Sequence, residues 1–259
     1  MLKVRVIPTL LFKQFGLVKG QKFNSWRRVG PLLPAIKVYN QRDVDELILV
    51  DILAHHDDGE PDIESIRELG QDCFVPLTVG GGIKDVGQVQ ALLRSGADKI
   101  SINTAPFDHP NIINEIASRH GSQCVVASVD VHVTHQGKWE AFSHAGQRPT
   151  GRDVIDWVRE LEDRGAGEIL ITSIDRDGTM SGYDLALVEK VVSAVKIPVI
   201  ASGGAGSYEH MIDVVLNAGA SAVAAASIFH FTELTPQGAK LAMSNRGIPI
   251  RQNYKENNC

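Results

Sequence analysis

Short runs of β-branched and aliphatic residues alternate along this chain with longer segments of helical periodicity. Such alternation is typical of parallel strands that are joined by crossover helices. Eight strands of this type favour a closed barrel over an open, doubly wound sheet. The predicted strands are residues 4–7, 46–51, 75–79, 99–102, 124–130, 168–172, 199–201 and 222–225.

An internal repeat strengthens the prediction of a barrel. The segment Val75-Pro-Leu-Thr-Val-Gly-Gly-Gly82 is similar to Ile197-Pro-Val-Ile-Ala-Ser-Gly-Gly204, which begins 122 positions later. Two half-barrels of four strands explain this match, whereas an open sheet leaves it unexplained. No linker or low-complexity stretch interrupts the chain. We therefore predict an α/β protein with one domain over residues 1–259, a (βα)8 TIM barrel with a half-barrel repeat.

Charge and composition exclude several classes of function. The formal net charge of −5 provides no basic face for nucleic acid, and no apolar run is long enough to span a membrane. The three cysteines, Cys73, Cys124 and Cys259, are widely spaced, which indicates reduced thiols in a cytoplasmic protein. The stretch His55-His-Asp-Asp58 has the composition of a metal cluster, but four adjacent loop residues converge poorly on one ion. No metal or other cofactor is predicted.

Two glycine-rich segments follow matching strands of the repeat. They are Gly80-Gly81-Gly82 and Ser202-Gly203-Gly204-Ala205-Gly206. Glycine allows a backbone to approach an anion and present its N–H groups, and a helix that begins just after each loop would add its positive end. Asn103-Thr104 and Ala226-Ser227, which follow the next strands, offer further donors. Tight turns alone would also require glycine, but the duplication favours a ligand with a phosphate at each end.

Catalytic groups of TIM barrels lie at the carboxyl ends of the strands. Asp51, Asp130 and Asp177 fall there, and each of them could move a proton, hold a hydroxyl group or simply cap a helix. Asp130 follows an apolar run, which favours catalysis, whereas Asp175 is interpreted as structural. Lys19, in the predicted loop after the first strand, could close over a phosphate.

Together these motifs resemble the cyclase subunit of imidazole glycerol phosphate synthase, in order and over nearly the whole chain. The matching segments include Leu17-Val-Lys-Gly20, Thr78-Val-Gly-Gly-Gly-Ile83, Gly96-Ala-Asp-Lys-Ile-Ser-Ile-Asn-Thr-Ala105, Thr172-Ser-Ile-Asp-Arg-Asp-Gly-Thr179 and Ala225-Ala-Ser-Ile-Phe229. The resemblance implies a barrel that joins ammonia from a glutaminase subunit to a bis-phosphate ribonucleotide. It implies that Asp130 is an acid–base residue. It assigns substrate or phosphate binding to Lys19, Asp51, Gly81, Gly82, Asn103, Thr104, Asp177, Gly178, Ser202, Gly203, Gly204, Ala226 and Ser227.

The resemblance also implies an ammonia gate at the opposite end of the barrel. Arg5, Glu46, Lys99 and Glu168 lie near the starts of the first, second, fourth and sixth strands. Without the resemblance, charges there would be read as exposed strand ends. With it, they form a neutral ring of ion pairs, here named the gate ring, beneath a glutaminase docked on the amino-terminal face of the barrel in a heterodimer.

One position departs from the family pattern. The segment Ile7-Pro-Thr-Leu-Leu11 ends in leucine where the family has its second acid–base aspartate, at the half-barrel position that corresponds to Asp130. Leucine cannot exchange a proton, so we favour a divergent branch that supplies ammonia for sugar amidation in surface-polysaccharide biosynthesis, with a sugar amidotransferase as a further component. The alternatives are a working histidine-pathway cyclase and a silent scaffold that activates the glutaminase. The related phosphoribosyl isomerase ranks last because it needs both aspartates and has no gate.

Overall fold

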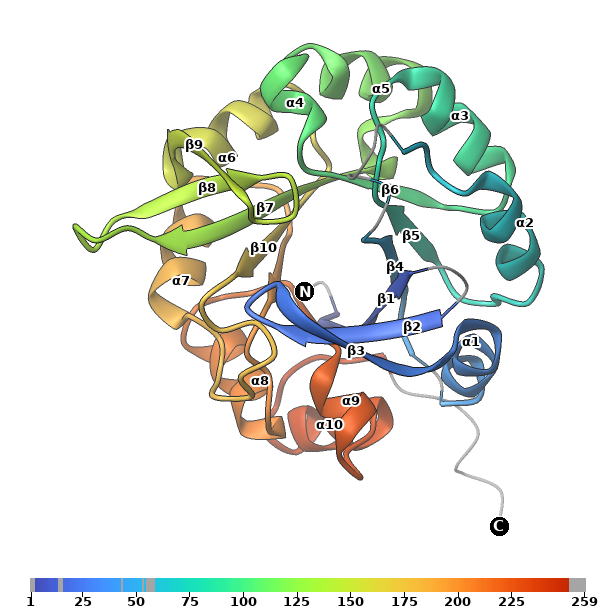
Figure 1. Cartoon of the computed structure of the whole chain (residues 1–259). Helices are drawn as coiled ribbons and strands as arrows, with labels where there is room; N and C mark the ends of the chain where they lie inside the picture. The colour runs from blue at the N-terminus through green and yellow to red at the C-terminus, as the bar shows by residue number, and fades with distance from the viewer. Residues whose placement is uncertain (1–2, 14–15, 43, 53, 55–58, 252–259) are drawn as a thin grey trace.

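The computed structural model describes residues 3–13, 16–42, 44–52, 54 and 59–251, and the segment His55–Asp58 and Cys259 therefore lie outside the described residues. Eight parallel strands close into a barrel, as Figure 1 shows. The ring closes because the first strand pairs with the last and the fifth pairs with the sixth. In order around the barrel, the strands are β1 (Arg5–Lys13), β4 (Leu47–Asp51), β5 (Leu77–Gly80), β6 (Lys99–Ile102), β7 (Val125–Val133), β10 (Glu168–Ser173), β11 (Val199–Ser202) and β12 (Ala222–Ala225).

The prediction of a TIM barrel is confirmed, and each of the eight predicted strands overlaps one strand of the barrel. The repeat is also visible in the element bounds. Strand β11 lies 122 positions after β5, and α8 (Tyr208–Leu216) lies 122 positions after α3 (Val86–Arg94). The two matching glycine segments therefore leave the barrel at equivalent places.

Two antiparallel hairpins on the rim of the barrel were not predicted. Strands β1 and β7 continue past the rim, and each pairs there with a returning strand. The first hairpin consists of β2 (Gly16–Gln21) and β3 (Asn24–Pro31), and the second adds β8 (Trp139–Ser143) and β9 (Arg148–Asp153). In Figure 1 the first hairpin crosses the mouth of the barrel, and the second projects outward from its rim.

Helices surround the barrel and cover the outer face of its strands (Figure 1). Side chains such as Ile36, Leu92, Ile112 and Trp157 are fully buried between the helices and the strands. The remaining helices are α1 (Leu32–Gln41), α2 (Ile63–Gln71), α5 (Ile112–His120), α6 (Val154–Asp163), α7 (Leu185–Ala194) and α10 (Pro236–Asn245), with short α4 (Ala105–Asp108) and α9 (Ser227–Phe231) and a 3-10 turn, η1 (Ser122–Cys124).

The interior of the barrel is filled in layers, as TIM barrels generally are. A middle layer of apolar side chains forms a separate buried cluster, which consists of Ile7, Ile48, Val126, Leu170, Ile200, Ala222 and Ala224. Charged side chains lie toward the amino ends of the strands, and a cavity lies at the carboxyl ends. The apolar layer therefore separates two polar regions on the barrel axis.

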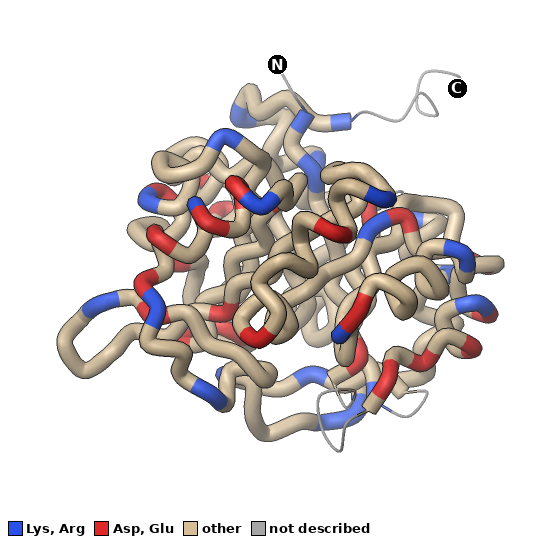
Figure 2. The backbone as a smooth tube through the Cα atoms, turned by 90° about the horizontal axis from the view of Figure 1, so that it is seen from above, with Lys and Arg blue, Asp and Glu red and all other residues tan. Residues whose placement is uncertain are grey.

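Among the described ranges, no helix combines the length and the apolar character that crossing a bilayer requires. Figure 2 shows Lys and Arg interspersed with Asp and Glu along the backbone. Cys73 and Cys124 are both free thiols, the first half-buried and the second buried.

Candidate active site

A cavity of about 530 Å³ opens at the carboxyl ends of the barrel strands. The residues that the sequence assigned to catalysis and to substrate binding all line it, although they come from distant parts of the chain. They are Lys19, Asp51, Gly81, Gly82, Asn103, Thr104, Asp130, Asp177, Gly178, Ser202, Gly203, Gly204, Ala226 and Ser227. Their roles in binding and catalysis stay predictions, but the fold brings them together in one place.

Asp130 is the buried acid of this cavity. It lies on β7, where the barrel strand continues into the rim hairpin, and it is 8% exposed. Burial, and secondly the nearby charge of Asp177, raise the pKa of Asp130 to about 7. A carboxyl group with such a pKa exchanges a proton readily near neutral pH, which is what general acid–base catalysis requires.

Lys19 and Asp177 form a buried ion pair beside Asp130. The ammonium group of Lys19 donates to both carboxylate oxygens of Asp177, at 2.8 Å each. The sequence placed Lys19 in a mobile loop, and this was wrong, because Lys19 lies in strand β2. The backbone N–H of Lys22 also donates to the carbonyl oxygen of Asp177 at 2.9 Å, so the first hairpin is tied to the loop after β10.

Asn103 and Thr104 connect β6 to the second hairpin. The amide of Asn103 donates to the carbonyl oxygens of Ser128 and Phe142, at 3.1 and 3.2 Å. The hydroxyl of Thr104 accepts from the backbone N–H of His144 at 3.0 Å. These bonds hold the turn between β8 and β9 against the cavity.

Asp51 lies at the end of β4, and its carboxylate accepts a hydrogen bond from the backbone N–H of Ala54 at 3.3 Å.

The two glycine segments have matching backbone geometry. Gly81 and Gly203 have φ angles of 109° and 87°, and a side-chain carbon on either would collide with the end of the preceding neighbouring strand. At Gly203 that carbon would lie 2.6 Å from the carbonyl oxygen of Ser173. The turns themselves therefore require glycine. Phosphate binding is supported by the position of both segments in one cavity, and not by the glycines alone.

A helix follows each glycine segment, as predicted. Helix α3 starts at Val86, four positions after Gly82, and α8 starts at Tyr208, two positions after Gly206. The side chains of Asp85 and Ser207 accept hydrogen bonds in the first turns of these helices. These cap residues satisfy part of each first turn, and the action of the positive helix ends on a ligand stays a prediction.

Leu11 lines the same cavity as Asp130. Four steps around the eight-stranded barrel separate β1 from β7, so these two side chains come from opposite walls. Leu11 continues the inward-facing series of β1 after Ile7 and Thr9. An apolar wall thus faces Asp130 where the family pattern has a second carboxylate.

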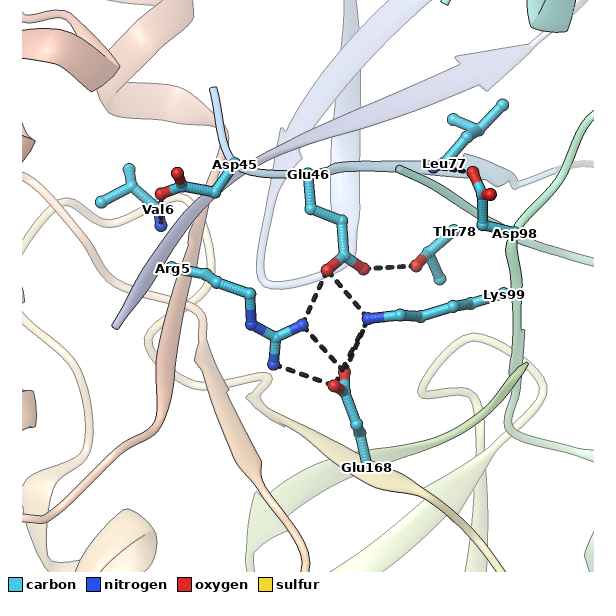
Figure 3. Close-up of polar contacts among 9 residues, drawn as sticks. All are labelled: Arg5, Val6, Asp45, Glu46, Leu77, Thr78, Asp98, Lys99 and Glu168. Atoms are coloured by element: carbon cyan, nitrogen blue, oxygen red, sulfur yellow. Dashed lines mark hydrogen bonds and ion pairs between the residues drawn. The ribbon is translucent and has the colours of Figure 1, made fainter. Parts of the chain in front are cut away.

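The gate ring forms at the amino-terminal end of the barrel, as Figure 3 shows. Arg5 contacts Glu46 at 2.7 Å and Glu168 at 3.0 Å. Lys99 contacts the same two carboxylates at 2.9 and 3.3 Å. All four side chains are thus joined in one closed circuit of ion pairs. Thr78 adds a hydrogen bond of 2.6 Å from its hydroxyl to Glu46.

Burial and charge oppose each other in the gate ring. The side chain of Glu46 is only 2% exposed, whereas that of Arg5 is 22% exposed and forms the outer edge. Burial disfavours the charge of Arg5, but Glu168 and Glu46 outweigh it, and the pKa of Arg5 is raised. The four residues therefore form a partly buried, electrically neutral plug on the barrel axis.

Sequence reasoning missed part of the cavity wall. Phe23 and Trp26 from the first hairpin, and Ala145 from the second, also line the cavity. Trp26 was not among the predicted site residues, because a rim hairpin was not predicted. The sequence did contain a signal for the second hairpin, because Gly137 stands between two runs of alternating apolar and polar residues. In the structure Gly137 has a φ angle of 74°, as a turn residue of this kind requires.

Asp175 has the structural role that was expected of it. Its carboxylate accepts from the backbone N–H of Val133 at 3.0 Å and lies 2.7 Å from Nδ1 of His132. It therefore ties the loop after β10 to the end of β7. Among the described residues, no group of three or more His, Cys, Asp or Glu side chains gathers in a way that could hold a metal ion.

A comparison with protein-family models gives one match over most of the chain. The model described as "Histidine biosynthesis protein" matches residues 5–235. The matched region includes all eight barrel strands, both glycine segments and the gate ring.

Proposed function

The chain belongs to the histidine biosynthesis protein family, and from that premise we propose that it is the ammonia-accepting synthase subunit of a glutaminase-dependent complex. The complex is of the imidazole glycerol phosphate synthase type. The family contains barrel isomerases and cyclases. A feature that serves ammonia transfer, and that an isomerase does not need, therefore distinguishes the two kinds of member.

The gate ring carries this proposal. Barrel interiors are normally packed with branched apolar side chains, and removing four charges from water is costly. A neutral circuit of two cations and two carboxylates on the barrel axis is difficult to explain as packing. It is suited to a passage that must exclude ions and water and open for a small neutral molecule such as ammonia.

The order of layers supports a route along the barrel axis. Ammonia released by a docked glutaminase would first meet the gate ring and then the apolar layer that includes Ile7, Ile48 and Leu170. The cavity with Asp130 lies beyond it. A bis-phosphate ligand bound by the two glycine segments would lie across this exit, and Asp130 could exchange a proton with it.

Leu11 supports a reaction that differs from the histidine pathway. A positioned acid or base contributes about 10²- to 10⁴-fold in rate, and Leu11 cannot supply one. We therefore place the chain in a divergent branch in which ammonia is supplied for sugar amidation in surface-polysaccharide biosynthesis. A sugar amidotransferase would then be a third component of the system.

The second candidate is a genuine cyclase of histidine biosynthesis. The specific observation in its favour is Asp130, whose pKa of about 7 suits it to act alone as both acid and base. In that case the bis-phosphate ribonucleotide and ammonia would give imidazole glycerol phosphate and aminoimidazole carboxamide ribotide.

The decisive experiment mixes the purified chain with ammonium at alkaline pH and the bis-phosphate ribonucleotide of histidine biosynthesis. Turnover at ordinary enzyme rates, about 1–10³ per second, would favour the histidine-pathway cyclase and exclude the proposal of a divergent branch. No turnover, with phosphate binding retained, is the result we expect. A titration in which no glutaminase subunit binds the chain would overturn the proposal as a whole.

A further inference from the structure

Phe74 is the most exposed large hydrophobic side chain of the described residues, at 80%. It lies in the connection between α2, which ends at Gln71, and β5, which begins at Leu77. This connection leads into the amino end of a barrel strand. Phe74 is therefore on the same end of the barrel as the gate ring.

The backbone around Phe74 is held on both sides. Its N–H donates to the side-chain oxygen of Asn40 in α1 at 3.1 Å, and the amide of Asn40 donates to the carbonyl oxygen of Asp72 at 2.5 Å. After Phe74, the carbonyl oxygen of Pro76 accepts from Leu47 at 2.9 Å. An aromatic ring on a fixed backbone can be buried by a partner with little loss of conformational entropy.

The distance from Phe74 to the gate ring is limited by the chain itself. Thr78, which donates to Glu46 of the gate ring, is only four residues further on. Four extended residues span at most about 14 Å. A standard protein–protein interface covers about 800 Å² on each partner, which corresponds to a disc of roughly 16 Å radius. The two lengths are similar, so a partner centred on the gate ring would extend to the neighbourhood of Phe74.

We propose that Phe74 is the apolar anchor through which this chain binds its glutaminase, by inserting its ring into an apolar pocket of that subunit. This inference rests on the proposed function and identifies a contact that decides partner affinity. Single exposed apolar residues are common on protein surfaces. Phe74 differs because it is aromatic, nearly fully exposed, fixed in the backbone and adjacent to a passage that must be sealed.

The test is a calorimetric titration with each purified glutaminase subunit of the imidazole glycerol phosphate synthase type from the same organism. Anchors of this kind dominate binding, so Phe74→Ala is expected to weaken affinity by about 30-fold or more. Phe74→Glu should weaken it at least as much, because a charge would enter the apolar pocket. Thermal unfolding of both variants checks that the fold is retained.

Leu185→Ala is the matched control. Leu185 is 37% exposed at the start of α7, which follows the carboxyl end of a barrel strand and so lies at the opposite end of the barrel. This variant should bind the glutaminase within about threefold of the unchanged chain. Loss of binding in Phe74→Ala but not in Leu185→Ala supports the inference.

Two other results would overturn the inference about Phe74, and both can be distinguished from a failure of the proposed function. Equal binding by the unchanged chain and Phe74→Ala would show that Phe74 is no anchor, while the glutaminase partnership stands. A dimer of this chain that dissociates on Phe74→Ala would show that a second copy covers this face. If the unchanged chain binds no glutaminase, the proposed function fails, and the inference fails with it.

Discussion

The nearby charge of Asp177 acts on Asp130 and raises its pKa, in addition to the larger effect of burial. The two carboxyl groups have different surroundings. Asp177 accepts from Lys19 with both oxygens, whereas none of the described residues donates a hydrogen bond to the carboxyl group of Asp130. One carboxyl group is thus fixed in an ion pair, and the other is available to exchange a proton with a ligand.

Asp177→Asn should lower the pKa of Asp130 below about 7. The substitution removes a negative charge and leaves the ammonium group of Lys19 without its partner, and both changes favour the ionised form of Asp130. Burial remains, so the pKa should stay above 3.8, its ordinary value. A carbon-13 NMR titration of the carboxyl group would measure it. Asp175→Asn is the control, because Asp175 pairs with His132 and should leave this pKa unchanged.

Asp130→Asn should increase stability at alkaline pH. The pKa of Asp130 is raised to about 7 from 3.8, so between these values the folded state holds a proton that the unfolded chain has released. Stability of the unchanged chain therefore falls as pH rises through this window, by an amount on the order of 4 kcal/mol when complete. Urea unfolding at several pH values should show a difference between the two proteins that grows from pH 4 to pH 7. A difference independent of pH would contradict this.

Gly203→Ala should weaken phosphate binding as well as stability. Alanine at a φ angle of 87°, with its side chain 2.6 Å from the carbonyl oxygen of Ser173, would displace the turn after β11. Backbone strain alone costs about 1–3 kcal/mol in stability. Gly137→Ala is the control, because its φ angle is 74° and, apart from its chain neighbours, no atom of the described residues lies within 4 Å of the added carbon. If calorimetry with inorganic phosphate shows equal affinity in both variants, this loop is not a phosphate site.

The barrel was predictable because its signals repeat. Eight buried runs, and the similarity of the segments that begin at Val75 and Ile197, each point to the same architecture. The cavity was predictable for a related reason. Residues at the carboxyl ends of barrel strands must converge, so Asp51, Asp130 and Asp177 could be brought together without any knowledge of distances.

The rim was not predictable in the same way. Strands β2 and β3 contain Gly16, Ser25 and a run of exposed side chains, so they show no clean alternation of apolar and polar positions. Strand β2, which holds Lys19, forms by antiparallel pairing with β1 and β3, and the ion pair of Lys19 with Asp177 depends on a contact across 158 residues of sequence. Such long-range contacts override local propensity.

Glu46→Gln should destabilise the fold through the gate ring. Glu46 accepts from Arg5, Lys99 and Thr78, and its side chain is 2% exposed. Removing its charge leaves two cations facing Glu168 alone, and breaking a buried ion pair in this way typically costs about 3–5 kcal/mol. Arg5 and Lys99 are partly exposed, so we expect about 3 kcal/mol. Chemical unfolding measures the loss, and Glu168→Gln, whose side chain is 13% exposed, should lose less.

Leu11→Asp tests whether the cavity still contains the rest of a cyclase site. Leu11 and Asp130 line opposite walls of one cavity, so an aspartate at position 11 would restore a pair of carboxyl groups across the ligand. With ammonium and the bis-phosphate ribonucleotide, turnover should rise by about 10²- to 10⁴-fold. Leu11→Asn is the control, because asparagine is similar to aspartate in shape and polarity but cannot exchange a proton. The turnover rate of this variant should therefore stay low. A gain with aspartate alone would show that the missing carboxyl group is what separates this chain from a cyclase. Equal rates in both variants would instead place the divergence in the ligand-binding residues, because a complete acid–base pair would then have no ribonucleotide to act on.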